Sequence, residues 1–531
     1  MKPAKIAFIL NAHLPFVRHP EYPRFLEEDW LFESISESYL PLLRMFNRLA
    51  DDKIPYTFTI SLSPSLCAML QDPVLAERYT QYLERHIELG EKEVVRCKAE
   101  QPEFSDMAAF YLEQSRTNFH DFVELYKSNI LDGFKDLEER GYLELATTAA
   151  THAYLPLYKE YPSAINAQVE IGVQSFLTTF GHLPKGFWLP ECGYYPGLED
   201  VLRSHSISWF QTASQSMLLS PDKVDNGVYR PVHCHNGVAA FPRDFNGTSL
   251  VWSNSSGYPT DKVYREFYRD IGYDLPMEYI GPYVHEPEVR VFTGFKYWAI
   301  TGPSDQKVPY VRSIAQHRTV EHAHNFIYSL RRRTTALGPI LEKEPLLTLA
   351  FDAELFGHWW FEGVQWLEEV VRLIADGEEE VEMTTPSLFL EEEGESLQIA
   401  QPAFSSWGHG GYNAVWLDGS NSWSYRHIHK AIERMEELAV RFGDQLSLKQ
   451  RFLNQAAREV LLAMASDWSF MMYNKSSSEY ARKRVNDHLS NFNVVYSNMC
   501  KNAVNTEWLV KAEKRNTIFA DIDYNIFNPE H

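Results

Sequence analysis

The sequence predicts an α/β barrel that carries an excursion and is followed by an all-helical unit. Short continuous apolar runs alternate with helical patterns up to about residue 398, and such runs are typical of parallel strands buried on both faces. Polar residues follow several of these runs directly. This favours a barrel over a doubly wound sheet, because barrels place their chemistry at the carboxyl ends of strands. From Trp423 onward only helical patterns occur.

The predicted strands are short and lie between longer helical patterns. We expect strands at residues 5–10, 56–62, 142–147, 186–189, 207–212 and 346–351. We expect helices at about residues 28–49, 73–98, 106–138 and 308–337. In the first helix the apolar residues between Leu31 and Leu49 keep to one stripe. Strands that alternate with helices indicate an α/β fold.

The length of the chain predicts more than one structural unit. At 531 residues it exceeds the size at which a single core stops growing, so we expect two or three units. The stretch from about 192 to 243 is rich in turn residues and predicts an inserted, lid-like domain. The expected boundaries are 1–190 and 244–398 for the two parts of the barrel, 191–243 for the insertion and 399–531 for the helical domain.

Composition narrows the choice of partners. The formal net charge of −22 argues against nucleic acid or an anionic membrane and is compatible with a neutral substrate. The first apolar run is short and ends at Asn11 and His13, which fits neither a signal peptide nor a membrane span and predicts a cytosolic protein. The five cysteines include no CxxC pair, which argues against a disulfide framework and a zinc knuckle.

Aromatic residues make up 14 % of the chain, with 13 Trp and 29 Tyr. We expect about two thirds of them in the core and some of the others as flat platforms for the apolar faces of sugars.

Two carboxylates follow buried apolar runs. Glu191 follows FWLP and is flanked by Trp188 and Tyr194, and Asp352 follows LLTLAF in another aromatic stretch. A buried carboxylate needs a partner or a function, and pairing with an arginine or capping a helix explains each equally well. Two carboxylates across a cleft are also the equipment of glycoside cleavage. A separation of roughly 5–5.5 Å gives retention, and roughly 6.5–9.5 Å gives inversion.

Five ordered motifs resemble regions of glycoside hydrolase family 57, in particular its 1,4-α-glucan branching enzyme and AmyC-type α-amylase subgroup. They are HLP at 13–15, THAYLPL at 151–157, WLPECGYYPG at 188–197, FDAELFGHWWFEG at 351–363 and SSWGHGGY at 405–412. The similarity spans nearly the whole chain, from HPEYPRFLEEDWLFESI near its start to SDWSFMM near its end.

This resemblance implies a fold and a set of roles. The fold would be an incomplete, seven-stranded β/α barrel with a small inserted domain and a helical C-terminal domain that contributes to the cleft. The reaction would proceed with retention and without metal or cofactor. Glu191 would be the nucleophile and Asp352 the general acid/base. His13 and His152 match positions that hydrogen-bond the sugar beside the nucleophile.

Further residues match regions that line the family's cleft. Arg265, Gly281 and Asp467 are among them, although Arg269 fits the spacing as well as Arg265, and Asp467 could equally be an acid on a helix surface. The tryptophans expected as sugar platforms are Trp30, Trp188, Trp359, Trp360, Trp407 and Trp416. Trp407 is the best of them, because the glycines after it keep the loop low.

The resemblance narrows the substrate to α-1,4-glucan but leaves open which acceptor receives the cleaved chain. A branching enzyme transfers the cleaved chain to a 6-hydroxyl, whereas an α-amylase passes it to water. A 4-α-glucanotransferase is a further alternative. The ratio of transfer to hydrolysis depends on whether a lid excludes water from the site. We expect that lid near residues 214–243, with Tyr229 as a candidate tip. This chain has NAHLP where the wider family often has HQP, a form similar to the branching-enzyme subgroup. We expect a monomer or weak dimer.

Two other classes of protein compete with this interpretation. A metal-dependent polysaccharide deacetylase would need an Asp/His/His set. The histidine clusters at 317–324 and 427–429 lie in helical patterns, and a surface pair between His317 and Glu321 explains the first more simply. A non-catalytic glucan-binding protein would keep the tryptophans without both carboxylates. For Cys192 we expect a small buried residue, not a thiol nucleophile.

Overall fold

The computed structural model describes residues 4–530 except 254, 286–288, 305, 342 and 378–380. Its centre is a curled sheet that is nine-stranded over these residues, in the order β6-β7-β5-β4-β3-β2-β1-β8, with β9 beside β1. The strands are β1 Ala4–Ala12, β2 Phe58–Leu62, β3 Leu143–Thr148, β4 Gly186–Trp188, β5 Trp209–Thr212, β6 Val232–His233, β7 Ala239–Pro242, β8 Leu346–Asp352 and β9 Val381–Met383. All neighbours pair in parallel except β6, which is antiparallel to β7.

The sheet curls into an incomplete barrel, as predicted. Its two ends approach each other where Arg243, just after β7, forms a single parallel bridge to Thr348 in β8. Most strand residues are buried, which explains why the runs in the sequence are continuously apolar. The predicted strands at 5–10, 56–62, 142–147, 186–189, 207–212 and 346–351 all coincide with strands of this sheet.

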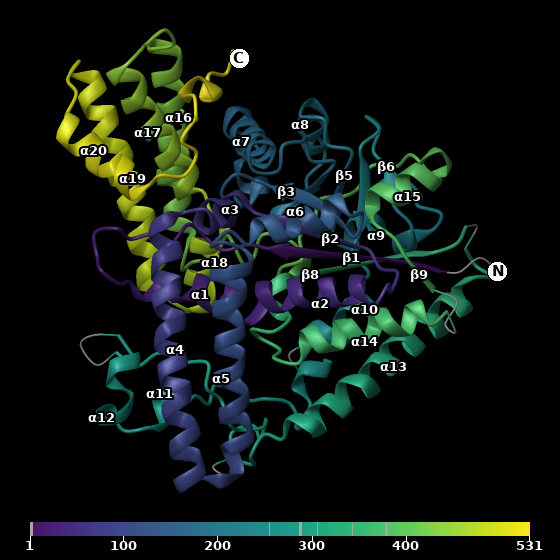
Figure 1. Cartoon of the computed structure of the whole chain (residues 1–531). Helices are drawn as coiled ribbons and strands as arrows, with labels where there is room; N and C mark the ends of the chain where they lie inside the picture. Colours follow the sequence, from purple (N-terminus) through teal and green to yellow (C-terminus); the bar gives the residue numbers. More distant parts are fainter. Residues whose placement is uncertain are drawn as a thin grey trace.

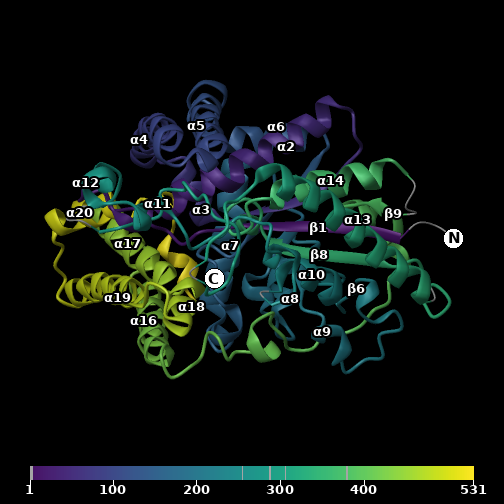
Figure 2. The same ribbon diagram turned by 90° about the horizontal axis from the view of Figure 1, so that it is seen from below.

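Helices cover both faces of the sheet (Figures 1 and 2). In Figure 1, α2, α13 and α14 lie below the sheet, α7 and α8 lie above it, and α6 overlaps the strands in this view. These and the other helices of the first 398 residues are α1 Asp29–Ser34, α2 Leu40–Asp51, α3 Pro64–Leu70, α4 Pro73–Glu100, α5 Ser105–Phe119, α6 Leu131–Glu139, α7 Pro162–Phe180, α8 Leu198–Ser204, α9 Gln215–Leu218, α10 Phe245–Trp252, α11 Ile271–Asp274, α12 Met277–Ile280, α13 Arg312–Leu337, α14 Gly363–Ala375 and α15 Pro386–Glu393.

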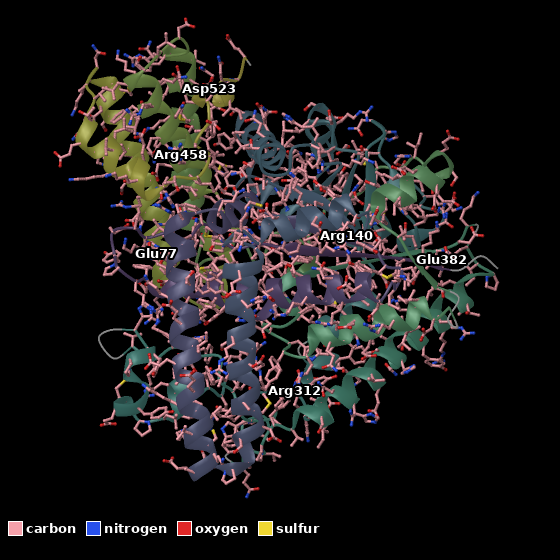
Figure 3. All side chains as sticks on the ribbon, in the orientation of Figure 1. Glu77, Arg140, Arg312, Glu382, Arg458 and Asp523 are labelled. Carbon is pink, nitrogen blue, oxygen red and sulfur yellow. The ribbon has the colours of Figure 1, made fainter. Side chains whose placement is uncertain are left out.

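The remaining helices form a separate bundle beside the carboxyl ends of the strands (Figure 1). They are α16 Ser422–Arg441, α17 Leu448–Ala463, α18 Ser466–Asn474, α19 Ser478–Cys500 and α20 Thr506–Arg515. Arg458, labelled inside this bundle in Figure 3, ties the chain end to it by donating to the carbonyls of Ile518 and Phe519. In the part of the chain that the structure describes, no helix has both the length and the apolarity to cross a membrane.

Two expectations about the chain need correction. Residues 191–243 were expected as an inserted domain, yet they supply β5, β6 and β7 to the central sheet, because their short apolar runs pair in register with β4 and with each other. The helix expected over 106–138 is broken. It ends in a π-helical turn, His120–Leu125, and the left-handed backbone of Lys127 and Ser128 separates this turn from α6.

Candidate active site

The two carboxylates lie at the carboxyl ends of strands. Glu191 follows β4 within a 3-10 turn, Pro190–Cys192, and Asp352 is the last residue of β8, in register with Asn11 of β1. Glu191 and Cys192 have φ of 62° and 50°, a left-handed conformation that costs energy in residues with a side chain. The sheet edge thus aims Glu191 through a strained turn, as is common at functional sites.

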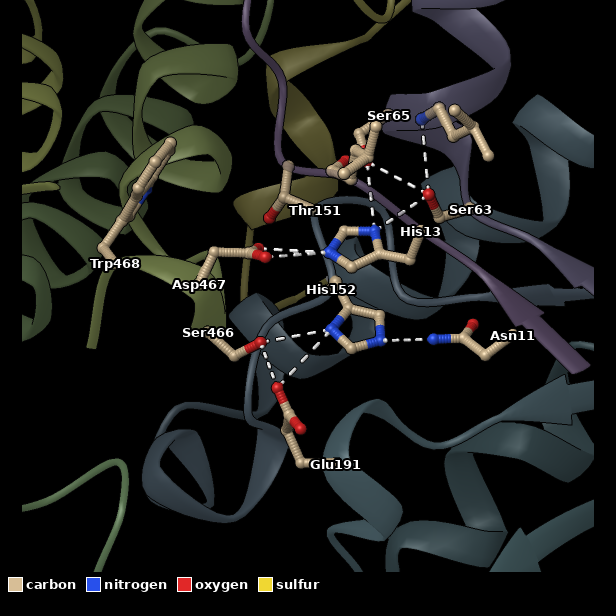
Figure 4. Close-up of polar contacts among 12 residues, drawn as sticks. Asn11, His13, Ser63, Ser65, Thr151, His152, Glu191, Ser466, Asp467 and Trp468 are labelled. Atoms are coloured by element: carbon tan, nitrogen blue, oxygen red, sulfur yellow. Dashed lines mark hydrogen bonds and ion pairs between the residues drawn. The ribbon is translucent and has the colours of Figure 1, made fainter. Parts of the chain in front are cut away.

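Glu191 is held from two sides by donors on distant segments. Its Oε2 accepts a hydrogen bond from the indole Nε1 of Trp407 at 2.8 Å. Its Oε1 accepts one from the Ser466 hydroxyl at 2.9 Å, and Figure 4 shows this second contact. Burial raises the pKa of Glu191, the charge of Asp467 raises it further, and the hydrogen bond from Trp407 opposes this rise. The two donors fix the orientation of the carboxylate, which is largely buried from water.

Asp352 has the more perturbed carboxyl group. Burial raises its pKa to about 7, the charge of Glu191 adds to this, and Asn11 lowers it by a hydrogen bond. A carboxyl with this pKa keeps a substantial protonated fraction at neutral pH and can donate its proton. Glu354, two residues later, also has a pKa raised to about 7, by burial and by the charge of Asp352. Its Oε1 accepts hydrogen bonds from the backbone of His13, at 3.2 Å, and from the Tyr39 hydroxyl.

Two stacked histidines link these carboxylates to the helical bundle. The rings of His13 and His152 lie 3.9 Å apart and almost parallel (Figure 4). His13 Nε2 is 3.1 Å from Asp467 Oδ2, and His152 Nδ1 is 3.1 Å from the Ser466 hydroxyl. Burial lowers the pKa of His13, but the charge and hydrogen bond of Asp467, together with the charges of Glu354 and Glu191, outweigh burial and leave the pKa raised. Burial and the charge of His13 hold the pKa of His152 well below its usual range, so a proton taken up by the pair favours His13.

The predicted tryptophan platforms fall into two groups. Trp359 is 48 % exposed, and the half-buried Trp407 presents its ring next to Glu191. Trp188, Trp360 and Trp416 are 2 % exposed or less, so their rings pack in the core and offer no free face to a sugar. Each ring packs in a different apolar cluster: Trp360 in the main core, Trp188 among residues of the strands and Trp416 against Tyr154 and Val415.

The other predicted site residues lie further out. Trp30 is half-buried on α1, where it meets Tyr480 edge-on. Arg265 is buried against Phe361, 3.9 Å from its ring centre, and donates to Tyr111. No hydrogen bond or ion pair among the described residues links Arg265 to the two carboxylates. Gly281 begins a 3-10 turn after α12, where an added Cβ would lie 3.8 Å from Met277 Sδ, and Arg269 forms a surface ion pair with Asp274.

The candidate lid tip, Tyr229, is displaced from the site. It is half-buried and precedes Arg230, whose guanidinium binds the carbonyl of Glu344, two residues before β8 begins. This contact lies at the amino end of the strands, whereas the carboxylates lie at the carboxyl end. The surface pair between His317 and Glu321 is present, with 3.5 Å between His317 Nε2 and Glu321 Oε1. Within the described ranges, no group of three or more His, Cys, Asp or Glu side chains is arranged to hold a metal ion.

Sequence reasoning missed several residues of this site. Arg243 donates to the carbonyl of Ala350 and lies over the rings of Trp407 and Trp252, at 5.2 and 5.9 Å. Its charge also acts on Asp352. Arg243 follows the short run AAFP, so the signal that identified the carboxylates, a polar residue after an apolar run, could have found it. Nothing in the sequence around Trp252 marks a role, and Ser466 lies in the SDWSFMM segment, where the prediction named only its neighbour Asp467.

Comparisons with known proteins agree with this geometry. The model of glycosyl hydrolase family 57 matches residues 7–402, and that of the 1,4-alpha-glucan branching enzyme C-terminal domain matches residues 427–527. The 1,4-alpha-glucan branching enzyme TK1436 of Thermococcus kodakarensis is 32 % identical over 518 residues, which cover 92 % of this chain and 72 % of the relative.

Solved structures of full length also superpose well. The alpha-amylase AmyC from Thermotoga maritima has 41 % identity and a TM-score of 0.92, with 99 % of each chain covered. The GH57-type branching enzyme from Pyrococcus horikoshii has 30 % identity and a TM-score of 0.88, with 100 % of this chain and 98 % of that one covered.

Proposed function

The chain belongs to glycosyl hydrolase family 57, and from this we propose that it is a 1,4-α-glucan branching enzyme that works with retention. One observation carries the choice: the helical unit that resembles the C-terminal domain of branching enzymes supplies Ser466, which hydrogen-bonds Glu191. The domain that resembles branching enzymes therefore contacts the proposed nucleophile of the barrel directly.

The proposed first step breaks an α-1,4 bond. The carboxylate of Glu191 attacks the anomeric carbon of the donor, and the glycosidic oxygen leaves with the proton of Asp352. The raised pKa of Asp352 suits this role, since it keeps the proton available at neutral pH. Glu191, held by Trp407 and Ser466, suits a nucleophile that must keep one orientation.

The proposed second step transfers the chain. The 6-hydroxyl of an acceptor glucan attacks the anomeric carbon, the bond to Glu191 breaks, and the carboxylate of Asp352 takes the hydroxyl proton. His13 and His152, stacked beside Glu191, would hydrogen-bond the hydroxyls of the sugar there. We propose that Asp467 holds His13 in its charged form, and that Trp359 and Trp407 stack on sugar rings.

Amylose with a coloured iodine complex tests the proposal. Wild-type protein should lower iodine staining while reducing ends rise little, and new α-1,6 linkages should be released by a debranching enzyme. Glu191→Ala should abolish the change in staining, whereas Glu77→Ala, at an exposed glutamate on α4, should not. Staining that falls without any α-1,6 linkage would contradict the branching proposal.

A second candidate function is hydrolysis of α-1,4-glucan. It is favoured by the 41 % identity to a protein described as an alpha-amylase. In the same experiment, an amylase would raise reducing ends in step with the loss of staining. In either case we propose a cytosolic enzyme of glycogen-like glucan metabolism that acts as a monomer or weak dimer. The five free cysteines, four of them buried, are compatible with a reducing compartment.

A further inference from the structure

A row of aromatic rings leads from Glu191 across the site. Trp407, whose indole binds Glu191, faces Trp252 with ring centres 6.0 Å apart. Trp252 meets Trp359 at 6.0 Å, and Trp359 meets His358 at 6.5 Å. Trp252 and Trp359 are 36 % and 48 % exposed, so the row presents faces and edges to solvent.

The row continues beyond His358 into a second set of rings. We name this set the outer ring cluster and define it as Phe267, Tyr268, Tyr273 and Phe292. Phe267 lies 5.5 Å from His358, and it contacts Tyr268 at 5.1 Å and Phe292 at 5.7 Å. Phe292 contacts Tyr273 at 5.3 Å. Tyr268 is 76 % exposed and Tyr273 is 49 % exposed, although the clustering of four rings would otherwise favour burial.

The outer ring cluster rests on a rigid polar base. The ammonium of Lys296, with a side chain only 3 % exposed, lies 3.7 Å from the centre of the Phe292 ring and 5.2 Å from that of Phe267. It donates to the carbonyl of Phe267 and pairs with Asp270. Asp270 in turn accepts a hydrogen bond from the Thr293 hydroxyl at 2.7 Å. The rings are therefore held in place before any ligand arrives, which lowers the entropy cost of binding.

The position of the cluster relates it to Asp352. His358 and Trp359 lie on the segment that follows Asp352 directly, and Glu37 fixes His358 through a 2.6 Å contact to Nδ1. The general acid/base serves the departing chain first and the attacking hydroxyl afterwards, so both occupy the side of Asp352. Figures 1 and 2 place α11, which carries Tyr273, on the same side of the molecule as α18, at the carboxyl ends of the strands.

We propose that the outer ring cluster binds the acceptor glucan chain. The inference rests on the proposed branching function and adds the site at which the acceptor chain binds. Sugars offer apolar faces to aromatic rings and hydroxyls to Tyr268 and Tyr273, and a neutral ligand suits a chain of net charge −22. The unbroken ring contacts from Trp407 to Tyr273 give an acceptor a continuous track toward Asp352.

The test separates transfer from cleavage. With amylose as donor and acceptor, Tyr268→Ala should lower the number of α-1,6 linkages per new reducing end by about three- to tenfold, as expected for loss of one stacking contact. The acceptor concentration needed for half-maximal transfer should rise by a similar factor. Tyr328→Ala removes a 60 % exposed tyrosine from α13 and should leave both quantities at wild-type values.

A binding measurement keeps this inference distinct from the function. Maltoheptaose should bind Glu191→Ala more tightly than the double variant Glu191→Ala, Tyr268→Ala, with Tm values of the two variants within error of each other. Equal binding and an unchanged linkage ratio would overturn the outer ring cluster as a glucan site, whatever the wild type produces. If the wild type forms no α-1,6 linkage but binding still differs, the branching function fails and the ring site stands as a glucan site without an acceptor role.

Discussion

At the scale of single residues, the site combines strain with directed hydrogen bonds. Glu191, Cys192 and His152 adopt positive φ without being glycine. Such conformations persist only when the surroundings fix them, and here Trp407 and Ser466 hold the Glu191 side chain. The orientation of the proposed nucleophile therefore depends on individual donors that point mutations can remove.

Replacing Trp407 by phenylalanine should slow the reaction while an aromatic ring still fills the same place in the loop. The ring remains, but the indole N–H that donates to Glu191 Oε2 is lost. Hydrogen bonds to charged groups contribute about 1.5–3 kcal/mol, so kcat should fall by about ten- to hundredfold. Trp423→Phe, which removes an indole N–H without a hydrogen-bond partner, serves as the control in the same amylose assay. A wild-type kcat in Trp407→Phe would contradict the role of this bond.

The pKa of Asp352 predicts the alkaline side of the pH profile. Cleavage needs the protonated carboxyl, whose pKa is about 7, so kcat/KM should fall about tenfold per pH unit above that value. The measurement is the initial rate of glucan cleavage between pH 5 and about 9. A rate that stays constant to pH 9 would show that Asp352 is not the acid.

The same pKa makes a prediction for stability. An acid whose folded-state pKa is raised from 3.8 to about 7 destabilises the folded protein when ionised, so the wild type loses stability as pH rises through this interval. Asp352→Asn stays neutral and should raise Tm relative to wild type by about 1–3 °C at pH 8 and by less at pH 4. Asp376→Asn, at an exposed acid, should show no such pH-dependent gain.

At the scale of elements, the helix that precedes the site is not regular. A π-helical turn, Ile35–Tyr39, separates α1 from α2, and it brings Tyr39 to Glu354 and Glu37 to His358. Extra residues in a turn shift the side chains beyond it, and such turns occur frequently at functional sites. The continuous stripe of apolar residues predicted a single helix here, and periodicity alone cannot reveal a one-residue shift in hydrogen bonding.

Gly357 permits this turn to approach the segment after Asp352. Its φ is 104°, and a Cβ atom would lie 1.8 Å from the carbonyl oxygen of Glu37. Gly357→Ala should therefore destabilise the fold by about 2 kcal/mol or more and reduce activity, because Asp352 and Glu354 move with the segment. Gly377→Ala is the matched control, since its φ of 72° brings strain but, among the described residues other than its chain neighbours, no atom would lie within 4 Å of the added Cβ. Equal Tm values for the two variants would exclude the steric explanation.

At the scale of the whole molecule, the helical bundle completes a site built by the barrel. Residues 466 and 467 contact His152, Glu191 and His13, which are more than 270 residues away in sequence. An antiparallel bridge between Ala153 and Ala465 and a bond from the Thr151 hydroxyl to the carbonyl of Leu461 fix the two units together. The bundle therefore contributes directly to the electrostatics of the site.

Replacing Asp467 by asparagine should lower the pKa of His13. The raised pKa of His13 depends on the charge of Asp467, and the resulting stabilisation is present below the ordinary value of 6.5 and is lost as pH rises through the folded-state pKa. In Asp467→Asn, His13 should titrate at lower pH in an NMR titration, and kcat at pH 7 should fall about tenfold. Asp444→Asn, an exposed acid of the same helical unit, should leave the His13 titration unchanged.

The sequence by itself determined the class of fold, the strands that carry the chemistry and the positions of Glu191, Asp352, His13 and His152 at strand ends. Apolar runs and the polar residues after them are local features. A parallel strand that is buried on both faces requires a continuous apolar run, so these features can be read from the sequence. Only the tertiary structure decided that β6 and β7 belong to the sheet, that Trp360 is core and that Trp252 and Ser466 reach the site. These outcomes depend on contacts between segments far apart in the chain, and no local pattern of residues encodes which distant partner a side chain will meet.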